Sequence, residues 1–76
     1  MDETIKSLAM LRAENNLSQR DLARKLNIQP GTIGMYESGK RTPPLSRAIE
    51  IARFFDIPVE KISFSTINYN KKGEGE

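Results

Sequence analysis

Two short amphipathic helix patterns joined by a turn of three residues restrict this chain to a small set of helical folds. The first pattern begins at Ser18, whose hydroxyl can accept a hydrogen bond from the Asp21 backbone N–H. The Asp21 carboxylate can accept one from the Ser18 backbone N–H, an arrangement called a capping box. Asn27 can adopt the left-handed backbone conformation that ends a helix. The second pattern begins at Pro30, which fits only the first turn of a helix, so Gln29 is its N-cap. The sequence therefore predicts a helix over 18–26, a turn over 27–29 and a helix over 30–37.

The segment before these two helices predicts another helix, from Thr4 to Glu14. Ile5, Leu8 and Leu11 fall on one face of that helix, as the core-facing side of an amphipathic helix requires. We expect this helix to be mainly structural.

The second half of the chain predicts two further helices. Pro43-Pro44 starts the first of them and Asp56 ends it, and only one of its two adjacent phenylalanine rings can face the core. We expect Phe55 to lie in the core and Phe54 to be partly exposed. A short helix is expected over 57–62. The predicted fold class is therefore all-α, a compact domain of five helices.

The C-terminal residues differ in composition from the helical part. The segment from Ser63 to Tyr69 is rich in β-branched and aromatic residues, which predicts either a short strand or an extended arm. Residues 70–76 hold no apolar side chain and are expected to form a disordered polar tail. The sequence thus predicts one domain over 1–69, with its core over 4–62.

The composition argues against several classes of function. The 76 residues include no cysteine and no histidine, which removes disulfides, thiolate metal sites and the commonest general base. We therefore expect no enzyme activity, no metal and no cofactor. The sequence holds no apolar run long enough to span a bilayer, and its acidic start, Met1-Asp2-Glu3, is unlike a secretory signal. A cytoplasmic location is expected.

Positive charge is concentrated in the middle of the chain. Residues 18–47 carry six basic and two acidic side chains, a net charge of +4, whereas the whole chain carries +2. A basic stripe of this kind neutralises phosphates and releases counterions from nucleic acid. For Arg24 or Lys25 alone, an ordinary solvated helix face is the alternative interpretation.

Residues 8–62 resemble the small bacterial and phage repressors of the Cro and lambda-repressor type, in the Xre-like branch. The residues that carry this resemblance are Leu11-Arg12, Leu17-Ser18-Gln19, Leu22-Ala23, Ile33, Tyr36-Glu37, Gly39, Pro43, Ile51-Ala52 and Ile57. The resemblance implies a lambda-repressor-like DNA-binding fold whose second and third helices form a helix-turn-helix. It also implies that Arg12 pairs with Glu37, partly buried beneath this motif. It further implies that the partner is double-stranded DNA and that the function is regulation of transcription.

In a helix-turn-helix, the second helix of the motif enters the major groove of double-stranded DNA, and residues beside it hold the phosphates. Ser18 and Gln19 are expected to grip one phosphate together with the free backbone N–H groups at the start of their helix. Lys40, Arg41 and Thr42 follow the second helix and are expected to hold another. An ordinary solvated turn is the alternative for Lys40 and Arg41.

The second helix of the motif is unusually poor in side chains that read bases. The residues expected to contact bases or line the groove are Gln29, Pro30, Gly31, Thr32, Gly34 and Met35. The outward positions after Gln29 lack the Gln, Asn and Arg side chains that make bidentate base contacts. Either the small residues let the backbone sit deep in the groove, with Thr32 and Met35 against thymine methyl groups, or sequence specificity is poor.

Two function classes follow. The favoured one is a sequence-specific DNA-binding transcriptional regulator, a repressor that occupies a two-fold operator as a homodimer. The alternative is a protein-interaction adaptor, partner to a toxin or an anti-repressor, in which the helix-turn-helix binds DNA weakly or non-specifically.

Overall fold

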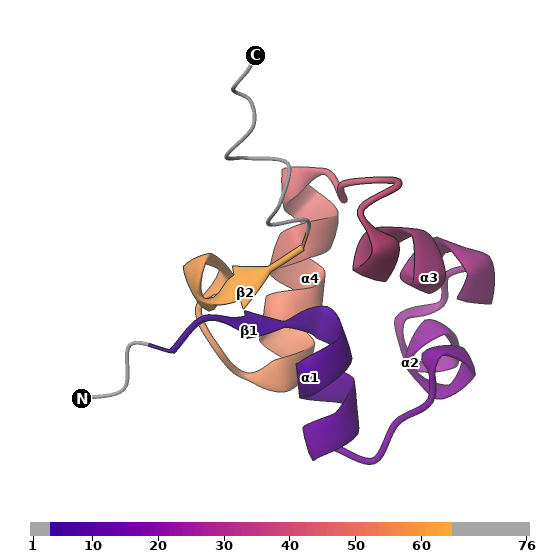
Figure 1. Ribbon diagram of the computed structural model, residues 1–76, viewed down its shortest axis with the longest axis horizontal. Coiled ribbons are helices and arrows are strands. Elements are labelled where there is room, and N and C mark those ends of the chain that lie inside the picture. Colours follow the sequence, from indigo (N-terminus) through magenta and orange to yellow (C-terminus); the bar gives the residue numbers. More distant parts are fainter. Residues whose placement is uncertain (1–3, 65–76) are drawn as a thin grey trace.

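The computed structural model describes residues 4–64, which form four α-helices, one 3-10 turn and a pair of two-residue strands (Figure 1). In chain order the elements are β1 (Lys6–Ser7), α1 (Leu8–Glu14), α2 (Gln19–Leu26), α3 (Pro30–Ser38), α4 (Leu45–Phe55), η1 (Val59–Lys61) and β2 (Ile62–Ser63). The strands pair in parallel, with Lys6 opposite Ile62 and Ser7 opposite Ser63. The fold is therefore mostly helical, and a small sheet joins the first and last described elements.

Each of the four α-helices contributes one large side chain to the centre of the core. These are Leu8 from α1, Leu22 from α2, Ile33 from α3 and Ile51 from α4, all of which are almost wholly withdrawn from solvent. Figure 1 shows α2 and α3 together at one side of the domain and the strand pair at the other. The core therefore holds α3 by its inner face and leaves its outer face to solvent.

The local signals around α2 and α3 predicted both ends of α2 and the start of α3, whereas α3 ends at Ser38, one residue later than predicted. The hydroxyl of Ser18 accepts a hydrogen bond from the Asp21 N–H at 2.9 Å, and the Asp21 carboxylate accepts one from the Ser18 N–H at 3.0 Å. Asn27 ends α2 in the left-handed conformation, with φ of 60°. Gln29 is the N-cap of α3 and Pro30 is its first residue. The capping box, the turn and the start of α3 are thus confirmed.

The capping box makes one part of the stability of this domain pH-dependent. Hydrogen bonds from Arg24, and then from Ser18, lower the pKa of Asp21 from its ordinary value of 3.8 to about 2. Because the folded-state pKa is depressed, the charged carboxylate stabilises the fold fully above about pH 4 and loses this effect as the pH falls toward 2. We expect Asp21→Ala to lower the melting temperature at pH 7, with a difference from the parent that shrinks between pH 4 and pH 2. Circular dichroism melts over this range measure it, and a difference independent of pH would contradict it.

The first helix is shorter than predicted. It begins at Leu8 rather than Thr4, because Ser7 caps it with a side chain that accepts a hydrogen bond from the Met10 N–H at 3.1 Å. The two residues before the helix are extended and pair with β2. The expectation that Ile5 belongs to the core is also wrong, since this side chain is 51% exposed.

The predicted helix over 57–62 is wrong as well. Pro58 precedes a single 3-10 turn, and Ile62 is already extended, with φ of −106° and ψ of 135°, because it pairs with β1. Of the expected strand over 63–69, the described residues show Ser63 paired within β2, followed by a buried Phe64. The remainder of the expected strand or arm, 65–69, and the expected tail, 70–76, lie outside the described residues.

The fourth helix lies where the sequence predicted it, and part of its apolar surface faces solvent. Its N-cap is Pro44 and its C-cap is Asp56, in the left-handed conformation. As predicted, Phe55 packs against the core and Phe54 is partly exposed. Leu45 and Ile49, one turn apart, are exposed by 69% and 37%. Within residues 4–64, no helix is long and apolar enough to cross a membrane.

Candidate nucleic-acid interface

The outward face of α3 is made of small residues. Ile33 and Tyr36 point into the core, with 0% and 3% of their surface exposed. At 100° per residue, the opposite side of the helix carries Gly31, Gly34, Met35 and Ser38, which we call the outward face. Sequence reasoning had selected the first three of these but missed Ser38, which helical spacing from Gly31 indicates.

The two glycines of the outward face are not required by contacts inside the domain. A Cβ atom added at Gly31 would meet nothing within 4 Å. A Cβ atom added at Gly34 would meet the side-chain oxygen of Gln19 at 3.6 Å, which is an ordinary van der Waals distance. Neither has a positive φ, in contrast to Gly39, the C-cap of α3, whose φ is 83°. Of the three glycines within residues 4–64, Gly39 is therefore the one needed for backbone geometry.

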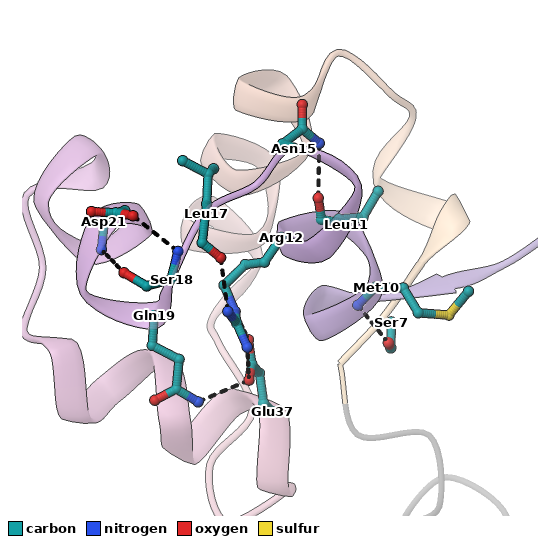
Figure 2. A network of polar contacts seen from close by, with 10 residues as sticks. All are labelled: Ser7, Met10, Leu11, Arg12, Asn15, Leu17, Ser18, Gln19, Asp21 and Glu37. Atoms are coloured by element: carbon teal, nitrogen blue, oxygen red, sulfur yellow. Dashed lines mark hydrogen bonds and ion pairs between the residues drawn. The ribbon is translucent and has the colours of Figure 1, made fainter.

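A network of charged hydrogen bonds fixes α3 against α1 and the start of α2 (Figure 2). The guanidinium of Arg12 donates from Nε and Nη2 to the two carboxylate oxygens of Glu37, the latter bond being 3.0 Å, and from Nη1 to the Leu17 carbonyl at 2.9 Å. The side chains of the pair are 18% and 11% exposed. The bond to Glu37 raises the pKa of Arg12 despite the opposing effect of burial. The pair is thus a bidentate clamp that orients the end of α3.

Gln19 extends this network toward the outward face. Its side-chain Nε2 donates to Oε1 of Glu37 at 2.9 Å, so the carboxylate receives hydrogen bonds from two elements at once. The amide therefore lies between Glu37 and Gly34, at the boundary of α2 and α3. Sequence reasoning placed Gln19 at the start of α2 but missed its bond to Glu37, for which the sequence holds no local signal. Ser18, the N-cap beside it, is exposed but is used by the capping box.

A second group of residues gathers at the other end of the motif. A surface hollow of about 510 Å³ is lined by Asn27, Ile28, Gln29, Pro30, Thr32, Tyr36, Arg41 and Arg47. It brings together three predicted base-contacting residues and one predicted phosphate-binding residue. The backbone N–H of Arg41 donates to the Met35 carbonyl at 3.2 Å, which holds the basic loop against α3. Lys40 and Thr42, from the same loop, are exposed.

Arg47 is a cation of this hollow that sequence reasoning counted in the basic stripe but did not single out as a contact residue. It comes from the first turn of α4 and contacts Glu50 at 3.3 Å, a long and partly exposed ion pair. A basic residue in the first turn of the helix that follows a basic loop is the signal that could have identified it. The described residues 4–64 contain no group of three or more acidic side chains placed to hold a metal ion.

Comparison with known proteins agrees with this geometry. A family model described as helix-turn-helix matches residues 8–62, which is more than half of the chain. The chain belongs to the helix-turn-helix family of Cro and Xre-like transcriptional regulators. The resemblance inferred from the sequence is thereby confirmed.

Several relatives of this helix-turn-helix regulator have names that state a role. An uncharacterized HTH-type transcriptional regulator of Methanocaldococcus jannaschii is 46% identical over 55 residues, which are 72% of this chain and 83% of that protein. The cryptic phage CTXphi transcriptional repressor RstR of Vibrio cholerae is 32% identical over 63 residues, 82% of this chain and 57% of the repressor. Multiprotein-bridging factor 1 of Candida glabrata is 45% identical over 38 residues, half of this chain and a quarter of that protein. No solved structure matches this regulator significantly.

Proposed function

We propose that this regulator binds double-stranded DNA sequence-specifically, and that it acts as a cytoplasmic repressor by occupying a two-fold operator as a homodimer. The observation that carries the proposal is the exposed outward face of α3, fixed to the core by Ile33 and Tyr36 and to α1 by the Arg12–Glu37 clamp. A helix held in this way can enter the major groove without losing its orientation. The name of the RstR repressor supports the repressor role.

Base contacts are assigned to the first two turns of α3. Gln29 is exposed and its side chain makes no cap hydrogen bond, which leaves its amide available for a base edge, adenine being the best partner. Pro30 and Thr32 line the same hollow as Gln29 and face the same groove. Gly31, Gly34 and Met35 complete the surface that meets the bases.

Phosphate contacts are assigned to two places on either side of α3. The first is the start of α2, where Ser18, Gln19 and the backbone N–H groups of the first turn face the backbone of one DNA strand. The second is the basic loop with Lys40, Arg41 and Thr42, to which Arg47 adds a further charge across the hollow. These contacts position the domain, whereas α3 reads the sequence.

The homodimer is proposed on two physical grounds. A domain of this size buries a modest core, and α4 exposes three large apolar side chains, those of Leu45, Ile49 and Phe54. Two copies related by a two-fold axis would present their α3 helices to half-sites about 34 Å apart. Sedimentation measurements on the free protein and on its DNA complex report whether two copies bind together.

The proposal is tested by selecting duplexes from a randomised pool at physiological salt and sequencing those that the purified protein retains. We expect a two-fold motif whose half-sites lie about ten base pairs apart. Retained duplexes without any common sequence would contradict sequence-specific binding.

The adaptor function is the second candidate, and two observations favour it. The exposed Leu45 and Ile49 of α4 offer an apolar surface to a protein, and one of the relatives is named as a bridging factor. If the selection returns no common sequence, this candidate becomes the better account. A binding screen against candidate protein partners would then follow, with Leu45→Ser as the variant that should lose the partner.

A further inference from the structure

We propose that the outward face of α3 reads the methyl groups of thymine by close approach of its backbone, and that Gly31 and Gly34 are the positions that determine this specificity. The inference rests on the proposed DNA-binding function and names what the same site recognises. The proposed recognition is by apolar contact, whereas hydrogen bonding is the commoner means of reading bases.

The first step is that the fold does not explain the two glycines. Glycine inside a helix is destabilising relative to alanine, because it loses more conformational freedom on folding. Open space surrounds the Cβ position of Gly31, and an ordinary contact distance separates that of Gly34 from Gln19. Alanine would therefore fit at both positions. The reason for glycine lies outside the domain, with whatever approaches this face.

The second step is that the outward face presents backbone where most helices present side chains. Gly31 lies at its centre, with Gly34 and the half-buried Met35 on either side. Ser38 lies about two turns after Gly31 on the same face. Its hydroxyl donates a hydrogen bond to the Met35 carbonyl at 3.3 Å and is therefore already engaged. When this face enters the major groove, the base edges at the floor of the groove therefore meet a shallow, largely apolar protein surface.

The third step is the chemistry of the base edges that this face meets. The thymine methyl is the one apolar group that the base pairs present in the major groove. Met35, the one large side chain of the outward face, is flexible and polarizable, which suits contact with this methyl. Every base pair presents hydrogen-bonding atoms in this groove, so the methyl group is what distinguishes thymine from the other bases for an apolar surface. The face therefore favours thymine.

The experiment replaces single thymines of the selected operator with deoxyuridine, which removes the 5-methyl group and leaves base pairing intact. We expect at least one thymine in each half-site at which this change weakens binding, by about fourfold for each buried methyl. The same replacement outside the half-sites is the control and should have no effect. Deoxyuridine without effect at every position would overturn this inference while leaving operator binding in place. A failure to select any operator would overturn the proposed function and this inference with it.

Glycine variants provide the second measurement. Gly31→Ala and Gly34→Ala should raise the melting temperature or leave it unchanged, yet weaken operator binding by about fivefold or more, because the added methyl holds the backbone away from the bases. Ala13→Gly, the reverse change at an exposed position of α1, is the matched control. It should lower the melting temperature and leave affinity unchanged. Glycine variants that bind the operator as tightly as the parent would overturn the inference.

Discussion

Replacing Glu37 with alanine is expected to destabilise the domain by about 3–5 kcal/mol, because it leaves the guanidinium of Arg12 partly buried without its carboxylate partner. The same change removes the acceptor of the Gln19 amide, so the end of α3 loses its connection to both α1 and α2. Chemical and thermal unfolding followed by circular dichroism measure the loss of unfolding free energy and the fall in melting temperature. A melting temperature within a couple of degrees of the parent would contradict the structural importance of this clamp.

The control for this prediction is an ion pair of similar type on the surface. Lys6 and Glu14 lie 2.9 Å apart with side chains 31% and 46% exposed, and such exposed pairs contribute about 0–1 kcal/mol. Glu14→Ala should therefore have a much smaller effect than Glu37→Ala. The double variant Arg12→Ala with Glu37→Ala should recover part of the stability lost in Glu37→Ala, since it leaves no stranded charge.

Reversing the charge of Arg41 is expected to weaken DNA binding by about tenfold or more, and to reduce the dependence of affinity on salt by about one unit of slope. The residue is exposed, and its backbone bond to Met35 does not depend on its side chain, so the fold should be unaffected. Titration of a labelled operator at several salt concentrations gives both quantities for Arg41→Glu.

Arg53→Glu is the matched control for this reversal. Arg53 is an exposed cation in the last turn of α4, whereas the basic loop precedes that helix. Arg53→Glu changes the total charge by the same amount and lies away from the proposed DNA contacts. Because Arg53 adjoins Phe54 of the proposed dimer surface, sedimentation must show that the variant keeps the oligomeric state of the parent. If the two variants lost affinity equally, the effect would be one of net charge and Arg41 would not be a contact residue.

The elements that could be predicted from the sequence are those whose ends depend on near neighbours. The capping box of α2 and the left-handed Asn27 involve residues within three or four positions of one another, so their signals are local. The strand pair could not be predicted, because Lys6 and Ile62 are far apart in the sequence and each strand has only two residues. Ile5 was misassigned for the same reason, since the extended β1 interrupts the apolar spacing that suggested a longer helix.

The candidate interface divides in the same way. The outward face of α3 follows from helical spacing, and its composition could be analysed without the structure. The bond from Gln19 to Glu37 and the approach of Arg47 to the hollow depend on how α2, α3 and α4 pack, and no pattern within any one helix encodes them. The assignment of all these residues to DNA stays a prediction.

The central claim is that α3 is the surface that meets DNA, and mapping amide chemical shifts of the labelled protein with the selected duplex tests it most directly. We predict that the largest shifts fall on Gln19, on 29–35 and on 38–42, and that a scrambled duplex shifts the basic loop but leaves 31–35 nearly unchanged. The largest shifts on Leu45, Ile49 and Phe54, or identical shifts with both duplexes, would contradict the claim that this helix reads sequence.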